Sequence, residues 1–164
     1  MTSPRDPTVT ASPTAEQLPV ALSDRLGFLL GRAHLAHRAI VERALASLDL
    51  GAKDFGALSI LVEEGPLSQQ RLGERQGVDR TTMVAVVDAL ERNELVERRR
   101  NPHDRRAYSL QATSKGRRVL REASDLAKQA EDEFLAPIPA RDRRLLKQLL
   151  RTLISRSPPA RGSR

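Results

Sequence analysis

The spacing of the apolar residues most constrains the fold of this chain, because it changes in the middle of the sequence and then changes back. Over most of the chain, apolar residues recur every three or four positions, which is typical of amphipathic helices. Between Leu95 and Ala112 they alternate instead, which predicts two strands, 95–100 and 106–112. Turn-forming residues at 101–104 separate these strands. We therefore expect a mainly α fold with one small β-hairpin.

Six helices are expected around this hairpin, and capping residues mark several of their ends. Their ranges are about 23–48, 53–64, 68–76, 80–92, 114–135 and 140–156. Ser68, Asp79 and Thr113 have side chains that cap helix starts, whereas Gly51 and Gly65 are placed to end the first two helices. Helical spacing within 80–92 predicts one buried face, which consists of Met83, Val86, Val87 and Leu90.

The two ends of the chain differ in composition from its centre. Residues 1–20 contain four prolines with many serines and threonines, and residues 157–164 are similar, so both are predicted to be disordered tails. A chain of 164 residues has the size of one domain, which we place at 21–156. Within this domain, about 53–112 would hold the short helices and the hairpin. The long helices would lie at about 22–48 and 114–156.

Residue types that the sequence lacks exclude several classes of function. There is no cysteine, which rules out disulfides, thiolate metal sites and thiol redox sensing. No run of about 18 apolar residues is present and the N-terminus lacks the order of a signal peptide, so we expect a cytoplasmic protein with no membrane partner. With three histidines and no glycine-rich phosphate loop, no catalytic constellation is visible. We expect neither an enzyme nor a cofactor.

Positive charge is concentrated in one part of the chain. The formal net charge is +7, and residues 96–121 contain nine basic residues against two acidic ones, which equals this excess. Only four of the 28 basic residues are lysine, and the remainder are arginine, which suits bidentate contacts to phosphate and guanine. Codon usage in a GC-rich genome would give the same preference for arginine. The clustering of the charge therefore carries the stronger indication of nucleic-acid binding.

Two short helices joined by a tight turn at Gly77 and followed by a basic hairpin are typical of a winged helix-turn-helix. The face of helix 80–92 opposite its apolar residues carries Thr81, Ala85, Asp88 and Arg92, and Ala85 is small enough to let the helix approach base edges. The DNA-binding residues predicted in the helices are Arg80, Thr81, Thr82, Ala85 and Gln69. Helix capping alone would also explain the threonines.

The wing is the hairpin with its arginine-rich tip. Its predicted DNA contacts are Arg100, Arg105 and Arg106, and Arg105 and Arg106 are the main ones. Arg98, Arg99 and Arg100 are expected to be either phosphate ligands or exposed strand residues. Asp104 is expected to hold one of these arginines by a charge-assisted hydrogen bond. Protection of a strand edge by charge would also place basic residues here, although lysines usually serve that purpose.

The segment "DRTTMVAVVDALERNELVERRRNPHDRRAYSLQATSKG", residues 79–116, resembles the recognition helix and wing of the MarR family of transcriptional regulators. "LSQQRLGERQGVDRTTM" is similar to its helix-turn-helix, and "DRR" followed by an alternating strand and "TSKG" to its wing signature. The resemblance covers about 20–156. It implies a homodimer joined by the first, fifth and sixth helices. It also implies a repressor that binds a pseudo-palindromic operator and leaves this DNA when a small, often aromatic acid binds. Asn101 departs from the family, which often has Asp there.

Two further expectations concern the long helices. Helices 23–48 and 140–156 carry more leucines than one small winged domain can bury, which indicates a homodimer, although both helices could also wrap their own domain. His34, His37, Arg38, Phe55 and Ser59 are candidates for an effector pocket in which Arg38 would meet an anionic ligand. The histidines lack the further ligands of a metal site, so no metal is expected. They could also be ordinary interface residues.

Two alternatives to a sequence-specific regulator differ from it in the distribution of charge. A sequence-neutral DNA-compacting protein would have dispersed, lysine-rich charge and no recognition helix. A membrane-surface helix would carry its basic residues along one amphipathic face, and here they lie on a hairpin and a helix start.

Overall fold

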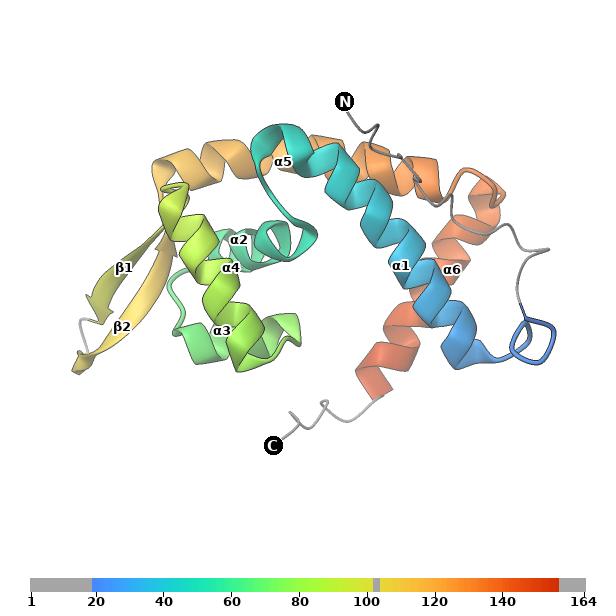
Figure 1. Cartoon of the computed structure of the whole chain (residues 1–164), viewed down its shortest axis with the longest axis horizontal. Coiled ribbons are helices and arrows are strands. Elements are labelled where there is room, and N and C mark those ends of the chain that lie inside the picture. The colour runs from blue at the N-terminus through green and yellow to red at the C-terminus, as the bar shows by residue number, and fades with distance from the viewer. Residues whose placement is uncertain (1–18, 102–103, 157–164) are drawn as a thin grey trace, which may run out of the picture.

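The computed structural model describes residues 19–101 and 104–156, with the backbone alone at 101, 104–107 and 156. The predicted fold class is confirmed: the described residues form helices and one antiparallel hairpin (Figure 1). The elements are α1 (Leu26–Leu45), the 3-10 helix η2 (Ala46–Leu48), α2 (Ala52–Glu64), α3 (Gln69–Gln76), α4 (Arg80–Arg92), β1 (Val96–Asn101), β2 (Asp104–Ala112), α5 (Ser114–Phe134) and α6 (Ala140–Arg156).

The first helix differs from its prediction at both ends. It begins at Leu26 after a turn, and its last residues tighten into η2. Asp49 ends η2 in the left-handed conformation, with φ of 52°, which the short polar side chain of aspartate tolerates. Gly51 has φ of −82° and precedes α2 as its N-cap, so the prediction that Gly51 ends the first helix was wrong.

The predicted caps of α2, α3, α4 and α5 are confirmed. Ser68 accepts a hydrogen bond from the N–H of Arg71, and Asp79 accepts one from the N–H of Thr82. Thr113 caps α5 in the same way by accepting from the N–H of Gly116. Gly65, with φ of 83°, ends α2. The helix starts were therefore predictable from local side-chain chemistry.

One apolar core joins the short helices to the hairpin. The predicted face of α4 is buried, and it packs with leucines from α2, α3 and β2, among them Leu58, Leu61, Leu72 and Leu110. Leu67, in the loop before α3, exchanges two backbone hydrogen bonds with Leu110, at 3.2 and 2.7 Å. The hairpin is thus fixed at its base, and its outer part projects from the lobe (Figure 1).

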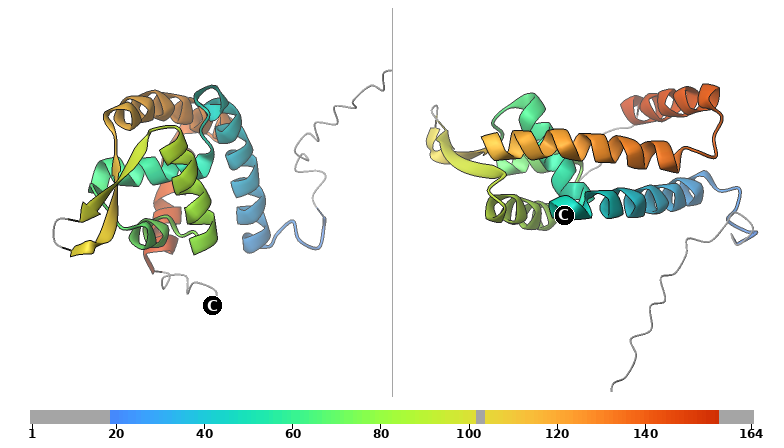
Figure 2. Two further views of the ribbon diagram at one scale, coloured as in Figure 1. Left: turned by 60° about the vertical axis from the view of Figure 1, so that its left-hand side comes forward. Right: turned by 90° about the horizontal axis from the view of Figure 1, so that it is seen from above.

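The long helices extend to one side of this lobe. α5 runs from the end of β2 across the molecule and α1 crosses it obliquely (Figure 1), while the view from above in Figure 2 places α5 between α1 and α6. The ring of His37 on α1 meets Phe134 of α5 edge-on, with centroids 5.2 Å apart. α6 turns back after α5 and contacts it through an ion pair between Lys147 and Glu131.

Candidate nucleic-acid interface

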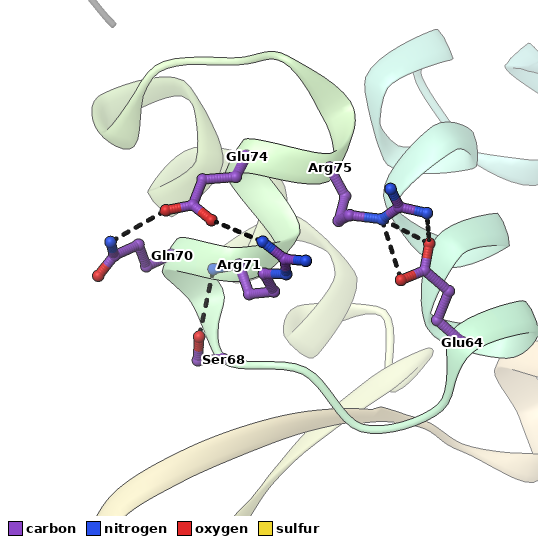
Figure 3. Close-up of polar contacts among 6 residues, drawn as sticks. All are labelled: Glu64, Ser68, Gln70, Arg71, Glu74 and Arg75. Atoms are coloured by element: carbon purple, nitrogen blue, oxygen red, sulfur yellow. Dashed lines mark hydrogen bonds and ion pairs between the residues drawn. The ribbon is translucent and has the colours of Figure 1, made fainter. Parts of the chain in front are cut away.

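The helix-turn-helix consists of α3 and α4, joined by a turn in which Gly77 has φ of 70°. Figure 3 shows how α3 is held against α2: Nε of Arg75 donates to both carboxylate oxygens of Glu64, at 2.7 and 3.0 Å. On the other side of α3, Gln70 and Arg71 each donate to the carboxylate of Glu74. The Glu74 contacts lie within α3, so the pair between Arg75 and Glu64 is the polar contact of this group that helps to orient α3 on α2 and thereby to place the start of α4.

The start of α4 combines a cap with exposed polar side chains. The N–H of Thr82 donates to Asp79 at 2.9 Å and its Oγ1 donates at 2.7 Å. Two hydrogen bonds from Thr82 hold the pKa of the Asp79 carboxyl below its ordinary value, and the one from the backbone N–H has the larger effect, ahead of the one from the hydroxyl. The hydroxyl proton of Thr82 is therefore used within the cap, and the lone pairs of its hydroxyl oxygen stay free to accept other hydrogen bonds. Arg80 and Thr81 are exposed.

The outward face of α4 agrees with the helical projection, with one addition. Thr81, Ala85, Asp88 and Arg92 are exposed, and Val84 beside them is 40% exposed. Val84 was not among the predicted DNA-binding residues, because it lies to one side of the face directly opposite the core. The available signal was an apolar residue outside the buried set. Small apolar side chains on a groove-facing helix can contact thymine methyl groups.

The register of the hairpin shows which wing residues face the core side. Pairs Val96↔Ala112, Arg98↔Leu110 and Arg100↔Tyr108 share one face of the hairpin, since directly opposed residues point the same way. Val96, Leu110 and Ala112 are buried, whereas Tyr108 is 55% exposed. Arg100 and Tyr108 therefore continue the core-facing side of the wing beyond the end of the core. Tyr108 was also missed, although the alternation of the strand places it on this face.

The three arginines of β1 have different surroundings. Arg98 is exposed on β1, as one of its two predicted roles stated, and it also binds Glu91 of α4 and Gln69 of α3, which was not predicted. Arg99 pairs with Glu97 of its own strand at 2.8 Å. Arg100 is exposed and has no ion pair within the described side chains. Arg105, Arg106 and Asp104 belong to β2, but their side chains lie outside what the structure describes, so their predicted contacts stay predictions.

One hollow that the structure describes is not lined by the residues predicted to form an effector pocket. That hollow lies between the ends of α1 and α4 and the start of α2, and is lined by Glu42, Ala46, Asp49, Leu50, Gly51, Asp54, Ala89, Arg92 and Asn93. Arg38 pairs with Glu42 at its edge, at 2.7 Å. Phe55 packs on the core, Ser59 donates to the Phe55 carbonyl, and His34 is exposed. The predicted pocket therefore stays a proposal.

Other kinds of site were sought among residues 19–101 and 104–156. No group of three or more His, Asp or Glu side chains is arranged there to hold a metal ion. None of the helices in these ranges combines the length and apolarity needed to cross a bilayer.

The fold and the exposed faces of α4 and the wing define a winged helix-turn-helix protein. The family model described as MarR matches residues 51–108. The transcriptional repressor NicR of Pseudomonas putida is 29% identical over 147 residues, which cover 90% of this chain and 93% of NicR. A probable transcriptional regulator from Pseudomonas aeruginosa is 30% identical with a TM-score of 0.75, over 80% of this chain and 98% of that one.

BpsR of Bordetella bronchiseptica, whose structure concerns regulation of DNA binding by 6-hydroxynicotinic acid, is 26% identical. Its TM-score is 0.76, over 86% of this chain and all of that one (100%). The chain belongs to the MarR family of transcriptional regulators. Its class of function is therefore transcription regulation through DNA binding, and proteins of this family are generally not enzymes.

Proposed function

We propose that this protein is a homodimeric repressor that binds a pseudo-palindromic operator and leaves it when a small acid binds. Each α4 would enter a major groove, and each wing would lie along the flanking DNA. The observation that carries this proposal is that two exposed surfaces lie on one shared apolar core. These are the outward face of α4 and the core-facing side of the wing at Arg100 and Tyr108. NicR is named as a repressor, which supports the sign of regulation.

The proposed contacts fall into two groups. On the helix-turn-helix they are Arg80, Thr81, Thr82, Ala85 and Gln69, with Val84 added for its exposure on α4. On the wing they are Arg100, Arg105 and Arg106, with Tyr108 added because a tyrosine hydroxyl can donate to phosphate. Contacts of the arginines and hydroxyls with phosphate would fix the position of the protein along the duplex. Contacts of Ala85 and Val84 with base edges would add sequence preference.

The dimer is supported by the uneven burial of α1. Leu26, Leu29 and Leu30 lie on the same apolar stripe of the helix as Val41. Val41 is buried at 6% exposure, whereas Leu26 is 61% exposed. The chain itself thus covers only the C-terminal half of a continuous apolar stripe. A second copy of the chain would cover the other half and would pair two recognition helices about 34–36 Å apart.

The proposed function predicts the outcome of a selection from random DNA duplexes. We expect the bound fraction to converge on an inverted repeat whose half-sites are separated by about one helical turn, 10–10.5 base pairs. Sequencing of the bound fraction gives this directly, and the selected duplex then serves to screen aromatic acids for release. Strong binding without any sequence preference would contradict the proposal and indicate a DNA-compacting protein.

Substitution of Arg100 tests the wing. We expect Arg100→Ala to weaken binding to the selected duplex by about tenfold. The slope of log affinity against log salt should fall by about one, because one phosphate contact is lost. The matched control is Arg99→Ala on the opposite face of the same strand, which should leave the slope unchanged. Equal slopes for Arg100→Ala and the unsubstituted protein would remove Arg100 from the DNA contacts.

A further inference from the structure

The guanidinium of Arg98 lies where the wing meets both helices of the helix-turn-helix. Its Nε donates to the two carboxylate oxygens of Glu91, at 3.1 and 2.9 Å. Its Nη1 donates to Oε1 of Gln69 at 3.3 Å, and its Nη2 lies 3.7 Å from Oδ1 of Asp88. One side chain of β1 thus contacts α3 once and α4 at two residues.

The place of Arg98 in the strand explains this reach. Val96, two residues earlier on the same face, is 3% exposed, and Leu110, directly opposite Arg98, is 2% exposed. The apolar core between wing and helices therefore ends at Arg98, whose side chain is 39% exposed. Its aliphatic stem covers the edge of the core while its guanidinium makes the polar contacts. Farther out along β1, Arg100 has no such contacts within the described side chains.

The surrounding charges distinguish Arg98 from a phosphate ligand. Asp88 and Glu91 lie about one turn apart on α4, and like charges at that spacing repel each other. Arg98 pairs with both of them. If its guanidinium turned to a DNA phosphate, two carboxylates would stay unpaired on the recognition helix, next to the negative duplex. The positive charge of Arg98 is thus already used within the protein.

We infer that Arg98 is a positioning residue, which sets the angle between the wing and α4 and makes no contact with DNA. Through this angle it fixes the distance between the contacts of the recognition helix and those of Arg100 and the wing tip. The inference rests on the proposed function, because it concerns how two DNA-binding surfaces are held in register. Small errors in such a register are costly, since both sets of contacts must form at the same time.

Glu91→Gln tests this role, because positioning and simple electrostatics give changes of opposite sign. If Glu91 holds Arg98 in place, its substitution lowers the affinity for the selected duplex by about threefold to fivefold, which corresponds to the upper part of the range for an exposed ion pair. If Arg98 is free to bind phosphate, removal of a negative charge from the recognition helix raises the affinity instead. A raised or unchanged affinity would overturn the inference.

Two further variants complete the experiment, at a temperature at which all of them are folded. Glu97→Gln removes the same charge from the opposite face of the wing and releases Arg99, so it should not weaken binding. Arg98→Gln should lower the affinity without changing the salt slope. A slope reduced by about one would show a phosphate contact and contradict the inference.

Amide hydrogen exchange of the free protein gives a readout that needs no DNA. Glu91→Gln and Arg98→Gln should both speed the exchange of the outer β1 amides relative to Glu97→Gln, because the wing is released from α4. Equal exchange rates in all three variants would overturn the inference even if the selected duplex is bound. Conversely, failure of the unsubstituted protein to select any duplex would contradict the proposed function alone.

Discussion

Gly116→Ala is expected to lower the free energy of unfolding by about 3 kcal/mol, at the high end for added volume in a packed site. A Cβ atom at residue 116 would lie 2.1 Å from the carbonyl oxygen of Leu95, 3.0 Å from its carbonyl carbon and 3.2 Å from Cδ1 of Leu58. The first two are backbone atoms, which cannot rotate away. The same carbonyl accepts a hydrogen bond from the N–H of Thr113 at 3.0 Å, so a shift of α5 would also disturb its cap.

Thermal unfolding at one protein concentration measures this effect, and the expected decrease in Tm is about 10 °C for a chain of this size. Ser124→Ala is the matched control. It also introduces alanine into α5, at an exposed position where the hydroxyl bonds only the Leu120 carbonyl. Its Tm should stay within about 2 °C of the unsubstituted protein. A similarly small change for Gly116→Ala would show that α5 does not approach Leu95 so closely.

The part of the fold that the sequence predicts well is the part governed by local rules. The buried face of α4 follows from helical spacing, and the caps at Ser68, Asp79 and Thr113 follow from side chains that can accept hydrogen bonds from a helix start. The residue that ends the first helix was predicted wrongly, because a glycine is the usual signal for a helix end. Here Asp49 takes the left-handed conformation instead. Nothing in the local sequence distinguishes Asp49 from an ordinary turn residue.

The candidate site was less predictable, because it depends on contacts between distant segments. The sequence identified Arg98 as one of a run of exposed arginines, since a strand pattern gives the face of a side chain but not its neighbours. Only the packing of β1 against the helix-turn-helix brings Arg98 to Glu91 of α4 and Gln69 of α3. For Tyr108 the sequence was sufficient, because Tyr108 lies two residues from the buried Leu110 and so shares its face of the strand.

Leu149→Glu is expected to convert the protein to a monomer and to weaken its binding to the selected duplex by at least about a hundredfold, because the two half-sites then bind independently. Leu145 and Leu149 lie on one face of α6 and are 51% and 53% exposed, although they are large apolar residues. The contacts of α6 with its own chain come from another face: Arg143 donates to the Ile138 carbonyl and Lys147 pairs with Glu131. A carboxylate placed in an apolar interface between two copies would have no partner.

Light scattering gives the mass of each variant in solution, and titration with the selected duplex gives its affinity. Gln148→Glu is the matched control, because residue 148 is exposed on the polar side of the same helix. It introduces the same charge and should stay dimeric with unchanged affinity. α5 carries the winged domain at one end and meets α6 at the other (Figure 1). In the proposed dimer, loss of a contact through α6 would therefore separate the two recognition helices without altering either of them. A dimeric Leu149→Glu protein would show that this face of α6 lies outside the interface, and the exposed stripe of α1 would then have to form it alone.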